Sequence, residues 1–213
     1  STTRSSELAV VGEGKIEVTP DVAFVDAGIT VNNVATVDEA QKLIDQTNQK
    51  ILQALRKLGI DKGDIKTTNY SINPNYSFEG DTNRIVGYNG NVTITIKVRN
   101  IRNVSSVLEA AAASGANQIQ GVRYSIDNPQ SLREQARNKA IQNAKDQANQ
   151  LAKSLGIRLG RVVNIVESSP NQPAPFTQRF QESALGGIGG AAGEVEPGTQ
   201  TVTSVVTLYF EKR

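Results

Sequence analysis

The chain has 213 residues, and its 23 basic and 21 acidic side chains leave a net charge of +2. With 38% hydrophobic and 21% charged residues it has a globular composition, long enough for one substantial domain or two small intertwined halves. Cysteine and histidine are absent, which removes the usual ligands of zinc, haem and iron–sulfur centres and the Cys–His and Ser–His catalytic pairs. We therefore expect no metal, no cofactor and no enzymatic activity. The charged residues form no basic cluster of the kind that nucleic-acid binding requires.

The chain begins with a polar segment followed by two stretches of alternating polarity. We expect residues 1–6 to be a disordered tail, left by removal of a signal peptide or by an arbitrary boundary. Residues 8–18 and 23–31 alternate between apolar and polar side chains, as half-buried antiparallel strands do. Because Thr19-Pro20-Asp21 is typical of a turn, the two stretches are predicted to form a hairpin.

A helix is predicted over residues 36–58, and two strands follow it. Thr36 and Glu39 have the spacing of a capping box, and Gly59 is suited to end the helix. The stretch 65–78 contains Pro74, which lacks an N–H donor, so it is predicted to be an edge strand. After a turn at 79–83, residues 86–98 alternate without interruption and give the clearest strand prediction in the chain.

The second half of the chain contains two further helices and three further strands. We predict a short helix over 103–115, a strand over 122–126 and a long helix from Pro129 to about Leu155. The long helix has alanine at every fourth position, at Ala136, Ala140, Ala144, Ala148 and Ala152, which permits close packing against a sheet. The last strands are predicted at 162–166 and 202–210. The predicted fold class is α+β, with an antiparallel-rich sheet of about seven strands packed by three helices, one of them long.

A Pro/Gly-rich segment at 170–198 has no periodicity and is predicted to be a loop. Its apolar residues are Phe176, Phe180, Leu185 and Ile188. They can pack on their own domain, contact a neighbouring subunit, or belong to a disordered loop. Ordering a backbone costs about 1–2 kcal/mol per residue, whereas burying one Phe or Leu returns about 1.5–3 kcal/mol, so four side chains cannot order this loop unaided. We therefore predict that the chain self-associates and that the segment 170–193 contributes to the contact.

Three motifs in this order resemble those of SIMPL-domain proteins, which include the periplasmic immunogenic proteins and their YggE-like relatives. They are Val11-Gly12-Glu13-Gly14 with Pro20-Asp21-Val22-Ala23, the helix from Leu132 to Ala140 that leads to Leu155-Gly156-Ile157, and Val195-Glu196-Pro197-Gly198 before the last strand. The resemblance implies one SIMPL domain over 7–213, exported to a periplasmic or other extracytoplasmic location. It also implies a protein that is often oligomeric, is linked to envelope or oxidative stress, and has no established catalysis.

Two functional hypotheses follow. The first is a non-enzymatic, exported cell-envelope protein that assembles into a homo-oligomer. The alternative is a small-molecule binding module whose pocket is lined by Tyr70, Tyr76, Tyr88 and Tyr124. No apolar run approaches the roughly 20 residues that span a bilayer, so no transmembrane segment is expected.

Overall fold

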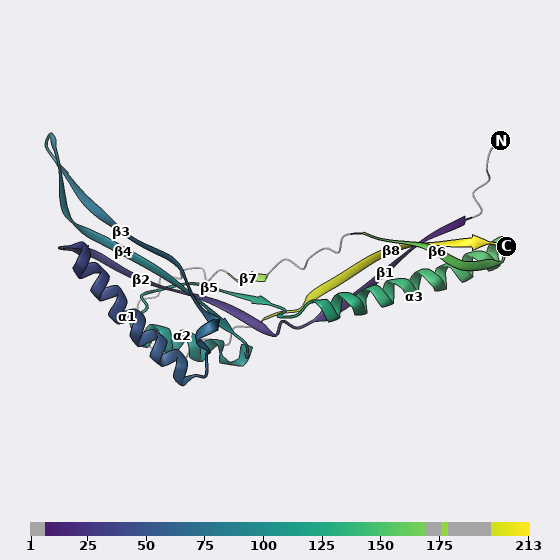
Figure 1. The fold of residues 1–213 in the computed structure, drawn as a ribbon, viewed down its shortest axis with the longest axis horizontal. Coiled ribbons are helices and arrows are strands. Elements are labelled where there is room, and N and C mark those ends of the chain that lie inside the picture. The colour runs from purple at the N-terminus through teal and green to yellow at the C-terminus, as the bar shows by residue number, and fades with distance from the viewer. Residues whose placement is uncertain (1–6, 169–175, 179–196) are drawn as a thin grey trace. The chain divides into compact units, whose positions relative to one another are not determined.

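The computed structural model describes residues 7–168, 176–178 and 197–213, and these form an α+β fold (Figure 1). The described residues contain three α-helices and two antiparallel sheets, one of three strands and one of five. The predicted α+β fold class is therefore confirmed. The described residues contain eight strands where the sequence predicts about seven, and the shortest of them has three residues.

The chain divides into two compact units that alternate along the sequence. Unit 1 combines Ser1–Pro20, Ile126–Ala174 and Gly198–Arg213, and unit 2 combines Asp21–Ser125 and Pro175–Pro197. Each unit has its own sheet and its own hydrophobic core. Each unit is thus assembled from segments that are separated in the sequence.

Unit 2 is built on the five-stranded sheet, in the order β3-β4-β2-β5-β7. Its main elements are β2 (Val22–Val34), α1 (Val37–Lys57), β3 (Ile65–Glu79), β4 (Thr82–Val98), α2 (Val104–Ala113), β5 (Gln118–Ser125) and β7 (Phe176–Gln178). Short 3-10 turns at Lys62–Asp64 and Ile101–Asn103 precede β3 and α2. Both helices pack on one face of the sheet, and their buried aliphatic side chains form a single core with those of β2, β4 and β5 (Figure 1).

The ends of α1 follow from its sequence. The Thr36 hydroxyl accepts a hydrogen bond of 3.1 Å from the Glu39 N–H, and such caps contribute about 1 kcal/mol. Gly59 follows the helix with φ of +80°, a conformation that favours glycine. The predicted cap and stop of this helix are both confirmed.

Unit 1 is built on the three-stranded sheet, in the order β1-β8-β6. Its elements are β1 (Glu7–Val18), α3 (Gln130–Leu155), β6 (Leu159–Ser168) and β8 (Gln200–Lys212). All five periodic alanines of α3 are buried, as their spacing predicts. The helix lies so close to β1 that a Cβ added at Gly12 or Gly14 would stand 2.2 or 2.1 Å from a carbonyl oxygen of α3.

The predicted hairpin of the first two strands is wrong. β1 pairs with β8 in unit 1, whereas β2 pairs with β4 and β5 in unit 2. Alternation along β1 and β2 correctly indicates that each strand has one buried face, but it does not identify the partner strand. Thr19-Pro20-Asp21 connects the two units rather than two neighbouring strands.

The predicted loop at 170–198 contains one short strand. β7 pairs with β5 through Val122–Gln178, Arg123–Thr177 and Tyr124–Phe176. Pairing with the edge of β5 explains why three residues without sequence periodicity form a strand.

Candidate interaction surface

The four residues predicted to mediate self-association lie in a segment of which the structure describes only a part. Phe176 is the first residue of β7, directly opposite Tyr124 of β5. Phe180, Leu185 and Ile188 lie outside the described residues. The role of these four residues therefore stays a prediction.

A surface that the sequence analysis did not identify lies on β6 of unit 1. Four of its β-branched apolar side chains are exposed: Val162, Val163, Ile165 and Val166. We call these four residues the β6 surface. Single exposed apolar residues are ordinary, but four within five positions on one strand are not.

On the face of the sheet that α3 covers, the exposure of Ile165 follows from the position of the helix. Ile165 lies opposite Leu208 of β8, so both side chains are on the same face of the sheet. Leu208 is 2% exposed, because it packs in the core formed with the alanines of α3, whereas Ile165 is 46% exposed. Helix α3 therefore covers β8 at this point but not Ile165, although it contacts both ends of β6 through Leu159 and Glu167.

A second group of exposed apolar side chains lies on the far end of the β3–β4 hairpin in unit 2. The last β2–β4 pair joins Val34 to Tyr88, so residues 75–79 and 82–87 pair only with each other. We call these residues the hairpin arm, which Figure 1 shows continuing past the end of β2. Its exposed apolar residues are Tyr76, Phe78, Ile85 and Val86. Two-stranded ribbons are marginally stable in water alone, so this arm would gain stability from a partner.

The tyrosines of the alternative hypothesis do not form a common pocket. Tyr124 pairs with Ala23, which pairs with Val98, and Tyr88 lies ten residues from Val98 along β4. At about 3.3 Å per residue, roughly 30 Å separates these two side chains along the sheet. Depressions of about 190 and 170 Å³ occur in unit 2, and none of the four tyrosines lines either.

Tyr70 has a local environment that alters its ionisation. Burial, followed by the charge of Asp45 on α1 and a hydrogen bond to it, raises the pKa of the Tyr70 hydroxyl above its ordinary value. The protonated form is favoured in the fold, so this stabilisation is present below pH 10 and is lost as the pH rises through the folded pKa.

We expect Tyr70 to ionise at higher pH than the ordinary tyrosine pKa of 10. The ultraviolet absorbance titration of the Tyr70→Phe variant, subtracted from that of the parent, should give a midpoint above 10. The same subtraction carried out in an Asp45→Asn background removes the neighbouring charge and should give a lower midpoint for Tyr70. A Tyr70 midpoint that is unchanged in that background would contradict the contact with Asp45.

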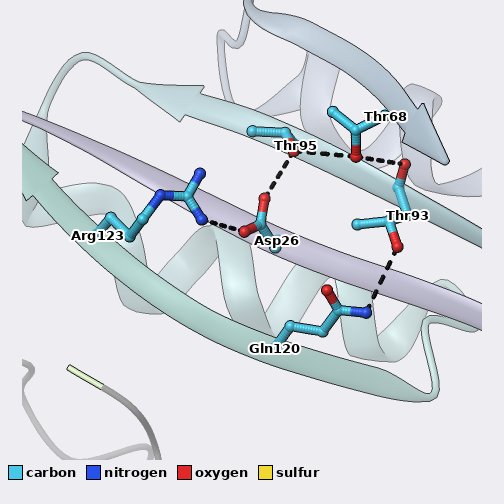
Figure 2. Close-up of polar contacts among 6 residues, drawn as sticks. All are labelled: Asp26, Thr68, Thr93, Thr95, Gln120 and Arg123. Carbon is cyan, nitrogen blue, oxygen red and sulfur yellow. Dashed lines mark hydrogen bonds and ion pairs between the residues drawn. The ribbon is translucent and has the colours of Figure 1, made fainter. Parts of the chain in front are cut away.

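The face of the five-stranded sheet opposite the helices is polar. Figure 2 shows Asp26 of β2 placed between Thr95 of β4 and Arg123 of β5. Its carboxylate accepts a 2.6 Å hydrogen bond from the Thr95 hydroxyl and forms an ion pair with Arg123. The Arg123 guanidinium also lies 5.9 Å from the centre of the Phe24 ring. These contacts connect three strands and give the Asp26 carboxylate a partner on each side.

A second set of contacts continues along this polar face. The Gln120 amide donates to the Thr93 hydroxyl at 3.4 Å, and the Thr68 hydroxyl donates to the Thr93 carbonyl at 3.4 Å (Figure 2). The two depressions described above are lined by other residues than these. The arrangement therefore supports a role in holding strands β3, β4 and β5 in register.

The sequence contained a sign of the β6 surface. Val162-Val163-Asn164-Ile165-Val166 is nearly continuous in apolar side chains, a pattern typical of strands buried on both faces. Burial on one face only would give alternation. The pattern therefore indicates more cover than unit 1 itself supplies.

Comparison with known proteins identifies the family. Residues 8–210 match the SIMPL family model, described as "Protein of unknown function (DUF541)", and the match spans both units. The 26 kDa periplasmic immunogenic protein of Brucella melitensis is 31% identical over 216 residues, covering 99% of this chain and 86% of the relative. Proteins called "Uncharacterized protein YggE" are 30% identical in Edwardsiella ictaluri, over 97% of this chain and 90% of the relative, and 27% identical in Escherichia coli K12, over 83% and 72%. The chain therefore belongs to the SIMPL family.

Proposed function

We propose that this chain is a non-enzymatic, exported protein of the cell envelope that assembles into a homo-oligomer. The Brucella relatives are named as periplasmic proteins, which supports an extracytoplasmic location. The lack of cysteine and histidine supports a non-enzymatic role. Among the described helices, none is long and apolar enough to cross a membrane. A link to envelope or oxidative stress forms part of the proposal on the strength of the family resemblance.

The observation that carries the proposal is the uncovered β6 surface. Among the described residues β6 has a paired strand on one side only, and a strand that is apolar on both faces and lies at the end of its sheet presents apolar side chains and backbone groups to a partner. The exposed apolar residues of the hairpin arm support the same conclusion independently, because they belong to the other unit.

The size of the β6 surface indicates that other residues also contribute. Its four side chains are already about half covered, so each returns roughly 1 kcal/mol on complete burial. Association costs about 4–15 kcal/mol in lost translational and rotational freedom. The β6 surface alone therefore gives weak association at best, and a stable oligomer needs further area, for which Phe176, Phe180, Leu185 and Ile188 are our candidates.

The assembly is tested by measuring mass in solution. Light scattering coupled to size-exclusion chromatography at 1–100 μM should give a mass several times that of the 22.8 kDa chain. A single species of one-chain mass throughout this range would overturn the proposal.

Removing the four candidate side chains from the 170–198 segment should weaken the assembly. A variant with serine at Phe176, Phe180, Leu185 and Ile188 is expected to dissociate at concentrations at least tenfold higher than the parent does, because about four apolar contacts are lost. The matched control places serine at Gln172, Gln178, Gln181 and Glu182 in the same segment, and it should dissociate like the parent. Equal behaviour of the two variants would exclude these four residues from the contact.

A further inference from the structure

We propose that unit 2 carries a binding site for small organic carboxylates, in the depression between α1 and the start of β3. The ligand has one carboxylate group and a short hydrocarbon chain. This site goes beyond the proposed function, because it lies within one chain and does not depend on self-assembly.

The two depressions of unit 2 differ in what they can bind. The one of about 190 Å³ is lined by Ser77, Glu79, Thr82 and Arg84 of the hairpin arm. Its two charged residues have opposite signs and none of the four is apolar, so it favours neither an ion of one sign nor a hydrocarbon group. The one of about 170 Å³ combines apolar with basic residues, and its lining consists of Asn48, Leu52, Arg56, Lys62, Ile65 and Thr67.

The periodicity of the two elements brings these side chains together. Asn48, Leu52 and Arg56 follow one another at intervals of four residues, so they form one row along α1. Ile65 and Thr67 are two positions apart on β3 and therefore lie on the same face of that strand. The depression thus lies between one row of a helix and one face of an edge strand.

The apolar part of the lining belongs to the margin of the unit 2 core. Ile65 is partly buried and packs against the core cluster that contains Ile51 and Leu55. Leu52 lies between these two buried residues in the sequence of α1 and is itself partly buried. A hydrocarbon chain placed on Leu52 and Ile65 would extend an existing core, and the gain in free energy is proportional to the apolar area removed from water.

The charge of the lining is positive. Arg56 and Lys62 are exposed, form no ion pair with the residues that the structure describes, and share the depression with no acidic residue. Asp64, close to Lys62 in the sequence, accepts hydrogen bonds of 2.8 and 3.0 Å from Arg99 instead. A guanidinium beside an ammonium group favours a carboxylate, to which arginine can donate two parallel hydrogen bonds.

The volume of the depression limits the length of the ligand. One water molecule takes up about 30 Å³ in the liquid, so 170 Å³ corresponds to about six such volumes. A carboxylate with a chain of a few carbon atoms fits this space, whereas the chain of a long fatty acid exceeds it. Pentanoate is therefore a suitable probe.

Two neighbouring lysines provide matched controls. Lys57 follows Arg56 in the last turn of α1, where both cations complement the negative end of the helix dipole, but it does not line the depression. Lys66 follows Ile65 on β3 and lies on the opposite face of the sheet, where it pairs with Thr95. These lysines have the charge of the lining residues without their position.

The site is tested with the full chain labelled at leucine and isoleucine methyl groups, whose NMR signals can be followed even in large assemblies. Titration with pentanoate should shift the methyl signals of Leu52 and Ile65, with a dissociation constant in the millimolar range because the ligand is small and both cations are exposed. Acetate, which lacks the chain, and pentanamide, which lacks the charge, should bind more weakly. Equal binding of all three, or shifts spread over the whole chain, would overturn the site.

Variants at the basic residues separate position from charge. Replacing Arg56 and Lys62 together with glutamine should weaken pentanoate binding about fivefold, since each exposed ion pair contributes little. The control variant with Lys57→Gln and Lys66→Gln has the same net charge and should bind like the parent, and circular dichroism should show an unchanged fold for both. Equal losses in the two variants would overturn the site but leave the proposed function standing. A one-chain mass in solution would overturn the proposed function but not the site.

Discussion

Replacing Gly12 and Gly14 together with alanine should destabilise unit 1 severely. At Gly12 the added Cβ would stand 2.2 Å from the Ala140 carbonyl oxygen, and at Gly14 it would stand 2.1 Å from that of Ala136. These atoms are helix backbone and cannot rotate away, so α3 would have to move from the sheet. Overpacking typically costs 1–3 kcal/mol per site and sometimes more, whereas whole domains are stable by about 5–15 kcal/mol.

The measurement is urea unfolding followed by circular dichroism, with hydrogen exchange to assign the loss to β1, β8 and α3. Gly63→Ala is the matched control, because its Cβ would meet no atom within 4 Å and its backbone is not left-handed. If the double variant unfolds at the same urea concentration as this control, the close contact between β1 and α3 does not exist.

Replacing Tyr124 with alanine should destabilise unit 2 by about 3–5 kcal/mol, the usual cost of removing a buried aromatic side chain. Tyr124 is 1% exposed and lies in the core with Val25 and Val98, whereas Tyr76 on the hairpin arm is 47% exposed. Tyr76→Ala is therefore the control and should change the free energy of unfolding by less than 1 kcal/mol.

The two tyrosine variants also separate a structural role from a binding role. Tyrosines that line one pocket would both be partly exposed. Replacing either of them would lower the affinity for a ligand more than it lowers the free energy of unfolding. Similar stability losses for Tyr124→Ala and Tyr76→Ala would contradict the conclusion that Tyr124 is buried and Tyr76 is exposed.

Much of the secondary structure could be predicted because its causes are local. Thr36 caps α1 through a residue three positions away, and Gly156 ends α3 with φ of +66°. Pro74 correctly predicted an edge strand, since β3 lies at the end of the five-stranded sheet. Each of these features depends on a few neighbouring residues.

The partners of the strands could not be predicted in the same way. Gln200 of β8 pairs with Val18 of β1 across almost the whole sequence, and nothing in the alternation of β1 distinguishes β8 from the nearer β2. The β6 surface was missed for a related reason. Its apolar run predicts a strand, but its exposure depends on where α3 lies relative to β8. The candidate residues of the 170–198 segment were proposed from composition alone, which cannot assign their contacts.

The division of the chain between the two units has a consequence for the order of folding. Unit 1 receives β1 from the start of the chain and its central strand, β8, from the last described residues. Every strand pair of its sheet involves β8, so the sheet cannot close until that segment has left the ribosome. Most of unit 2 is continuous from Asp21 to Ser125 and is available much earlier. Until β8 arrives, β1 and the alanine face of α3 remain open, and during this interval the chain is most vulnerable to aggregation and proteolysis.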